Sequence, residues 1–161
     1  MEKINRILEH DLFNVYLSEI SRIEEKEREF CHHDLIHFLD VARIAMILNL
    51  EEGIYVDKVL VYAAALLHDI GKHMEYKQQI PHEQASAILA PRILRDCGFE
   101  EPEVRLIVQA VAGHRSVHLA EAPTLSGIIY RADKLSRPCF SCAAADQCNW
   151  SDEKKNHALK Y

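Results

Sequence analysis

Apolar side chains recur at three- and four-residue steps along most of the chain. Between residues 4 and 23 this spacing predicts an amphipathic helix of about six turns. Between residues 35 and 50 it predicts a second helix, which Gly53 closes. Residues 56–69 are apolar on nearly all sides, so we expect a central helix that ends at Gly71.

Prolines and glycines mark three further helices. Pro81 opens a helix towards Gly98, which we expect to bend at Pro91 because an interior proline lacks a backbone donor. The remaining two run from about residue 102 to residue 114 and from about residue 124 to residue 135. Alternation typical of strands is confined to residues 127–130, whose flanks are helical in pattern. The sequence predicts an all-α fold of about six helices.

The length of 161 residues suits one domain with a sizeable core. We expect the helical domain to cover residues 1–138. Residues 139–161 are polar and rich in cysteine, and we expect them to form a tail that packs on the same domain, with a short helix from Ser151. We interpret the charged run at residues 24–29 as a solvated helix face.

Composition narrows the function classes. Hydrophobic residues make up 48% and charged residues 27%, which favours a globular protein over a disordered one. The formal charge of -6 disfavours nucleic-acid binding, which needs a basic surface. The longest apolar run, residues 59–67, is too short for a membrane span, and the amino terminus lacks the apolar segment of a signal peptide. With an odd count of five cysteines, these features predict a cytoplasmic protein with reduced thiols.

Candidate chemistry begins at His68 and Asp69, at the end of the most apolar predicted helix. Two polar groups are costly there unless they are hydrogen-bonded or bind a metal. His37 and Asp133 also lie among apolar residues. Imidazole and carboxylate groups suit iron, manganese, zinc or cobalt. The alternative is a capped helix end, with histidines that only hydrogen-bond to the backbone.

Three motifs make the metal interpretation specific: HFLDVA from His37, LLHDIGK ending at Lys72, and ADK around Asp133. Their residues and order strongly resemble the HD-domain superfamily of metal-dependent phosphohydrolases over residues 30–137. The resemblance implies an all-helical fold. It also implies that His37, His68, Asp69 and Asp133 bind a divalent metal.

His82 and His114 extend this resemblance to two-metal members of the superfamily. The order His, His-Asp, His, His, Asp is similar to that of bacterial symmetrical dinucleoside-tetraphosphate hydrolases, which are often di-iron enzymes. By this comparison Asp69 bridges two ions, with iron expected first and manganese, zinc, cobalt or nickel as alternatives. The two histidines could instead be surface residues at helix ends. Four others lack matching context and are expected at the surface or behind the ligands: His32, His33, His73 and His118.

Two ions would activate a water for in-line attack on a phosphoryl group, so no protein nucleophile is needed. Lys72 follows the ligands closely enough to reach a phosphate, and Arg115 and Lys134 are the next candidates for stabilising charge. Each could equally be a solvent-facing cation. The sequence has no Gly-rich phosphate loop, no nucleophile elbow and no dinucleotide fingerprint.

The cysteine-rich tail suggests a second site. Cys139, Cys142 and Cys148 lie within ten residues, and Cys31 could supply a fourth thiolate for zinc or an iron-sulfur cluster. The alternative is a set of reduced structural thiols.

The sequence thus predicts a metal-dependent phosphohydrolase that acts on a small phosphorylated substrate such as a nucleotide or dinucleotide. A non-catalytic nucleotide-sensing module, with the tail as a thiol or metal element, is the alternative. We expect no membrane or nucleic-acid partner, and either a monomer or a homodimer. Loops at residues 74–80 and 116–123 are expected to shape the pocket.

Overall fold

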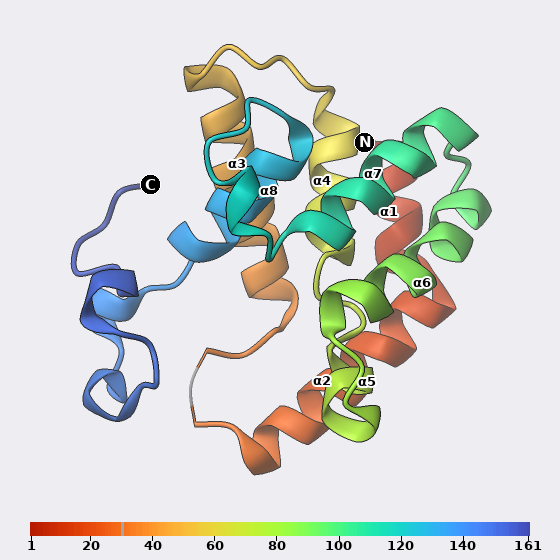
Figure 1. Ribbon diagram of the computed structural model, residues 1–161. Helices are drawn as coiled ribbons and strands as arrows, with labels where there is room; N and C mark the ends of the chain where they lie inside the picture. The colour runs from red at the N-terminus through yellow and green to blue at the C-terminus, as the bar shows by residue number, and fades with distance from the viewer. Residues whose placement is uncertain (30) are drawn as a thin grey trace.

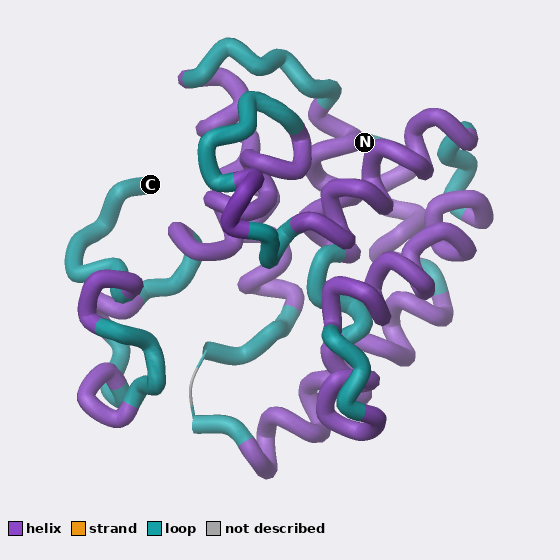
Figure 2. The backbone as a smooth tube through the Cα atoms, in the orientation of Figure 1, coloured by secondary structure: helices purple, strands orange, loops and turns teal. Residues whose placement is uncertain are grey.

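The structure is all-α, which confirms the predicted fold class. The computed structural model describes residues 1–29 and 31–161, and in these residues helices alternate with loops and no strand occurs (Figure 2). The α-helices are α1 (Glu2–Glu9), α2 (Asp11–Glu27), α3 (Leu35–Glu51), α4 (Lys58–Leu67), α5 (Lys72–Gln78), α6 (His82–Asp96), α7 (Glu101–Gly113) and α8 (Leu125–Leu135).

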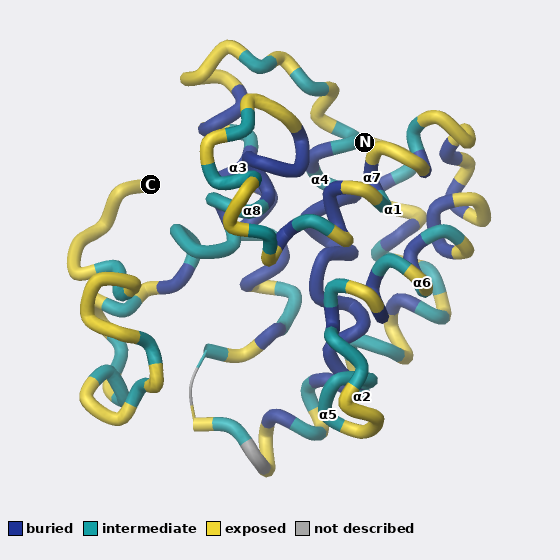
Figure 3. Tube along the Cα trace, viewed as in Figure 1, coloured by how far each residue is buried: buried dark blue, intermediate teal, exposed yellow. Residues whose placement is uncertain are grey.

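Helix α4 lies at the centre, where α1, α3, α6, α7 and α8 all contact it (Figure 1). Its residues from Ala63 to Leu67 are fully buried, and this end of the helix is correspondingly dark in Figure 3. Alanine side chains add little bulk, so neighbouring helices can approach α4 from several sides. None of the described helices is both long enough and apolar enough to cross a membrane.

The prediction of a single helix over residues 4–23 is wrong, because the helix is interrupted at His10, which separates α1 from α2. The backbone of His10 is extended there, and its ring Nδ1 accepts a hydrogen bond from the amide of Leu12 at 3.2 Å. The side chain thereby caps the start of α2, a role that apolar periodicity does not reveal.

The third helix was predicted over residues 56–69 and is shorter in the structure, where it forms α4. Asp57 caps its start by accepting from the amide of Val59 at 2.7 Å, and the helix ends at Leu67. His68 and Asp69 therefore lie in the turn that follows α4. Residues 74–80, expected as a loop, are mostly helical because α5 runs to Gln78 and ends with Gln79 in a left-handed conformation.

Gly71 lets α6 pack directly against the turn after α4. Its amide donates to Ser86 Oγ at 2.9 Å, and a Cβ added at this position would lie 2.4 Å from the backbone nitrogen of Ser86. This close approach fixes the start of α6 relative to Asp69. α6 then continues through Pro91 to Asp96.

The tail contains short 3₁₀ turns at residues 139–141, 145–147 and 152–154, the last in place of the predicted helix from Ser151. None of its residues is fully buried, and it lies beside the carboxyl end of α8 (Figures 1 and 3). Asn156 ties it to the domain by donating to the carbonyls of Lys134 at 2.8 Å and Arg137 at 2.9 Å.

Replacing Gly71 with alanine is expected to lower the free energy of unfolding by about 1 to 3 kcal/mol, because the new Cβ would overlap backbone atoms of α6. Urea denaturation measures this change. Gly113→Ala is the matched control, since its Cβ would meet the mobile end of the Leu119 side chain, which can rotate away. Native stability in Gly71→Ala would contradict the proposed close packing.

Candidate metal centre

The fold brings all six predicted metal ligands to one place. His37 lies in the first turn of α3, His68 and Asp69 follow α4, and Asp133 lies near the end of α8. His82 is the first residue of α6, and His114 directly follows α7.

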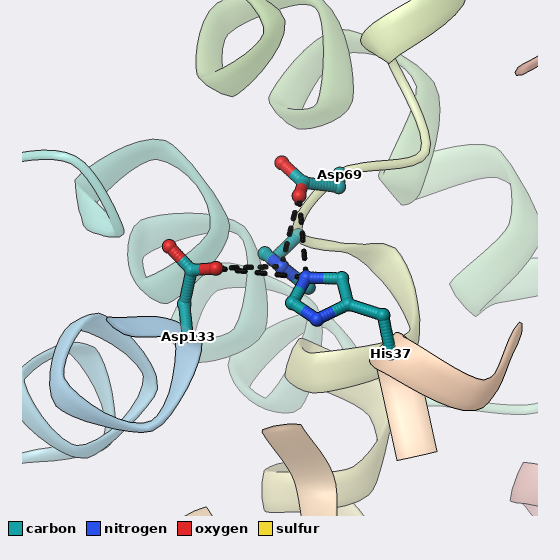
Figure 4. A group of neighbouring side chains, drawn as sticks. His37, Asp69 and Asp133 are labelled. Atoms are coloured by element: carbon teal, nitrogen blue, oxygen red, sulfur yellow. Dashed lines mark ion pairs between the residues drawn. The ribbon is translucent and has the colours of Figure 1, made fainter. Parts of the chain in front are cut away.

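Four of these residues form a first group. Nε2 of His37 lies 3.7 Å from Asp69 Oδ2 and 3.5 Å from Asp133 Oδ1. Nε2 of His68 lies 3.2 Å from Asp69 Oδ2 and 3.8 Å from Asp133 Oδ1. Figure 4 shows His37, Asp69 and Asp133 pointing at a common position from three separate segments. Their ligand atoms all lie within 4.8 Å of one another, close enough for one ion to contact them all.

A second group shares Asp69 with the first. The other carboxylate oxygen, Oδ1, lies 3.2 Å from Nε2 of His82 and 3.3 Å from Nε2 of His114. These three residues also satisfy the 4.8 Å limit. Each oxygen of Asp69 therefore faces one group, which is the arrangement expected of a bridging carboxylate.

The buried donors of both groups fit a bound cation. His68 Nδ1 donates to the carbonyl of Ala65 at 2.6 Å, and His114 Nδ1 donates to the carbonyl of Val111 at 2.7 Å. Each ring therefore presents the lone pair of Nε2 to Asp69. Among the described residues, Nε2 of both histidines and Oδ1 of Asp69 are buried without a hydrogen-bond partner. A cation in the first group would satisfy Nε2 of His68, and one in the second group would satisfy the other two atoms, whereas leaving them bare is costly.

Protonation states also suit ligation. Burial lowers the pKa of His37 to about 4 and lowers the pKa of His114, so both rings are neutral at neutral pH. Burial alone would raise the pKa of Asp69, but the neighbouring His68 and His33 hold it well below its usual value. Metals bind neutral imidazole and ionised carboxylate, the forms favoured at His37, His114 and Asp69. His68 differs: burial lowers its pKa, but Asp69 outweighs burial and raises it, so a cation would have to displace a proton from this ring.

Arg137 is a buried part of the site that the sequence analysis missed. Its Nη2 donates to Nε2 of His37 at 3.0 Å and lies 3.6 Å from Oδ1 of Asp133. Because a guanidinium can only donate, this contact is further support for a lone pair on Nε2 of His37. The spacing of Arg137, four residues after Asp133, could have indicated its position.

A cavity of about 650 Å³ opens onto Asp69, His82 and Asp133. The three predicted phosphate-binding cations, Lys72, Arg115 and Lys134, all line it. Other lining residues include further cations and two aromatic residues, namely Arg28, Arg137, Lys154, Tyr130 and Trp150.

The predicted cations are also engaged with acidic groups. Lys72 donates to Glu75, which in turn lies 2.9 Å from Nδ1 of His82. Lys134 lies 2.7 Å from Asp133, and the half-exposed Arg115 lies 3.4 Å from Glu83. Glu75 is a second residue that the sequence analysis missed.

One surface assignment from the sequence is wrong. Glu24, expected on a solvated helix face, is 1% exposed and contacts His33 and Tyr76. The side chain of Glu27, in the same run, lies outside the described residues. His33 was expected either at the surface or behind the ligands, and it is 5% exposed and lies beside Asp69, which agrees with the second position. His73 is also buried, whereas His32 and His118 are exposed.

Three of the five cysteines lie at the same cavity. Cys31, Cys139 and Cys148 line it. Burial raises the pKa of the Cys31 thiol, as do the nearby thiols of Cys139 and Cys142. Within the described residues, however, no three thiols lie close enough together to form a further group within 4.8 Å. A thiolate metal site therefore stays a prediction.

Comparison with known proteins agrees with this geometry. The HD domain family model matches residues 34–137, more than half of the chain. The predicted motif region begins slightly earlier, at Phe30, which lies outside the described residues. A relative from Clostridium beijerinckii, described as an uncharacterized protein, is 44% identical to this chain over 161 residues. The match covers both chains over their whole lengths. No solved structure matches the chain significantly.

Acid is expected to destabilise the metal-free protein partly through Glu24. Burial raises the pKa of this carboxyl, but hydrogen bonds from His33 and Tyr76 outweigh it and lower the pKa from 4.5 to about 2. The carboxylate therefore stabilises the fold fully above pH 4.5, and this contribution is lost as the pH falls through about 2. It amounts to about 3 kcal/mol.

Urea denaturation between about pH 6 and pH 2 measures this contribution. Glu24→Gln should flatten the pH dependence of the unfolding free energy, whereas the exposed neighbour Glu25→Gln should leave it as in the native protein. Equal pH dependence in both variants would contradict the assignment to Glu24.

If the cysteine tail binds zinc, the Cys139→Ser/Cys142→Ser variant will contain about one equivalent less zinc per chain by elemental analysis. Cobalt substitution should give an intense thiolate charge-transfer band in the native protein only. Cys97→Ala is the control, because this buried thiol lies outside the cavity. Identical metal content and spectra in all three proteins would exclude a thiolate site.

Proposed function

This chain belongs to the HD domain family of metal-dependent phosphohydrolases, and from that premise we propose that it hydrolyses a phosphate ester of a small molecule. The observation that carries the proposal is the sharing of Asp69 between two groups of ligands at the floor of a cavity. Divalent cations at these groups would supply an activated water and polarise the phosphoryl group. The complete ligand set favours an enzyme over a non-catalytic sensor.

The cations of the cavity suit an anionic substrate. Lys72, at the start of α5, lies beside His82 of the second group, and Lys134, near the end of α8, lies beside Asp133 of the first. Both have a carboxylate partner, so a phosphate could replace that partner as the acceptor. Arg115 is half exposed and can turn towards a bound phosphate without losing a buried contact. We assign these three residues to binding and charge stabilisation.

Asp69 has the central role in this proposal, because it orients both groups at once. Four imidazole rings face its two oxygens, and two of these rings are fixed by backbone carbonyls. Preorganised donors of this kind need little rearrangement when charge develops.

A nucleotide is the substrate class that best suits the rest of the cavity. Trp150 and Tyr130 provide aromatic surface beside the cations, and an aromatic ring is a suitable platform for a base. A volume of about 650 Å³ accommodates a molecule of that size. Iron as the metal, a cytoplasmic location and a homodimer stay predictions, since the same nitrogen and oxygen donors accept several ions.

Asp69→Ala is expected to lower kcat/KM by about 10³-fold or more, because both groups lose a ligand and several kcal/mol of transition-state stabilisation. The measurement is phosphate release from a panel of nucleotides, dinucleoside polyphosphates and a simple aryl phosphate. Elemental analysis of the same samples should show loss of metal.

Asp40→Asn is the matched control, because Asp40 lies on α3 one turn after His37 and pairs with Arg43 outside the site. Its turnover should equal that of the native protein. Unchanged turnover in Asp69→Ala would refute the mechanism. Tight nucleotide binding by the metal-loaded native protein without any product would favour the sensor instead.

A further inference from the structure

His33 lies beside the first group, although no motif points to it. It precedes the Asp34 cap of α3 and is 5% exposed. Its Nε2 lies 3.7 Å from Oδ2 of Asp69, the same distance that separates Nε2 of His37 from this oxygen. A fifth histidine thus faces the carboxylate that joins the two groups. Its ligand atom lies outside the 4.8 Å limit that unites each group, so a bound cation would have to draw the ring closer.

Two helices fix the ring of His33. Glu24 of α2 accepts from the His33 backbone amide at 2.7 Å and also contacts ring Nδ1. Tyr76 of α5 donates its hydroxyl to the same carboxylate at 2.6 Å. Glu24 is 1% exposed, so these bonds form away from water and hold a single orientation.

The hydrogen bond to Glu24 also determines where the ring proton lies. A carboxylate accepts, so Nδ1 of a neutral His33 carries the hydrogen and Nε2 carries the lone pair. That lone pair faces Oδ2 of Asp69. Two acceptors that face each other across 3.7 Å repel unless a cation or a donor lies between them.

Ligand histidines in metal sites have this same arrangement, with one nitrogen held by a protein acceptor and the other facing the ion. His68 and His114 follow it through the carbonyls of Ala65 and Val111. His33 follows it through Glu24. Buried His73 shares only the first half of this arrangement, because its Nδ1 donates to the carbonyl of Ile70 at 3.1 Å while its ring stacks on Tyr16 at a centroid distance of 5.0 Å. Among the described residues, the histidines that pair with Asp69 do not include it.

We propose that His33 is an additional ligand of the cation in the first group, and that Glu24 and Tyr76 are positioning residues that orient it. The inference rests on the metal centre of the proposed function. It makes the two groups unequal: the first would have three imidazoles and two carboxylates, while the second keeps two imidazoles and the shared Asp69. The second group then has more room for a substrate oxygen, and it is the group next to Lys72.

His33→Asn tests the proposal, because the asparagine amide can still donate to Glu24 in place of Nδ1 while Nε2 is removed. Metal-free native and variant proteins are titrated with Co²⁺, followed by calorimetry and by visible absorption. We expect the affinity for one of the two ions to fall about 10- to 100-fold and its absorption spectrum to change. The thermal midpoint of the metal-free variant should stay close to the native value.

Glu24→Gln should reduce the same affinity, and the double variant should lose less than the product of the two single effects, because both act on one ligand. His73→Asn is the matched control for a buried histidine and should bind Co²⁺ as the native protein does. His33→Ala serves as a second variant if the asparagine variant does not fold.

Native Co²⁺ affinity and spectrum in His33→Asn would overturn the assignment of His33, even if the native protein binds two ions and hydrolyses its substrate. A native protein that binds no Co²⁺ would overturn the metal centre itself. The two failures are therefore distinguishable.

Discussion

The buried carboxylate of Asp69 is the constraint on which the rest of the structure depends. Five imidazole rings face its two oxygens, and they come from the ends of four helices and the loop before α3. An ionised group in such a place is very costly unless its surroundings compensate it. The packing of the helices therefore has to bring their ends together around Asp69, as well as their sides.

Helix α4 and Gly71 meet this requirement in different ways. The alanines of α4 allow α3, α7 and α8 to pack closely, so that residues distant in sequence converge at its carboxyl end. Gly71 brings the start of α6, and with it His82, against the same turn. Packing and site geometry are thus two consequences of the same small residues.

The sequence predicted the helical class, and its HD motifs pointed to six residues that the structure brings together, because helical periodicity and short motifs are local signals. It failed where the deciding interaction links distant residues or depends on a single side chain. The break at His10 follows from one cap, and the burial of Glu24 follows from partners that lie 9 and 52 residues further along the chain. In a run of charged residues, nothing local distinguishes Glu24 from its solvated neighbours.

The ligands extend from His37 to Asp133, so an ion held by them would cross-link most of the domain. Such an ion binds the folded chain and not the unfolded one, so each increase in free metal would shift the folding equilibrium towards the native state. A cell short of metal would then lose more than turnover. It would carry a larger unfolded population exposed to its proteases, and the abundance of the protein would follow metal supply.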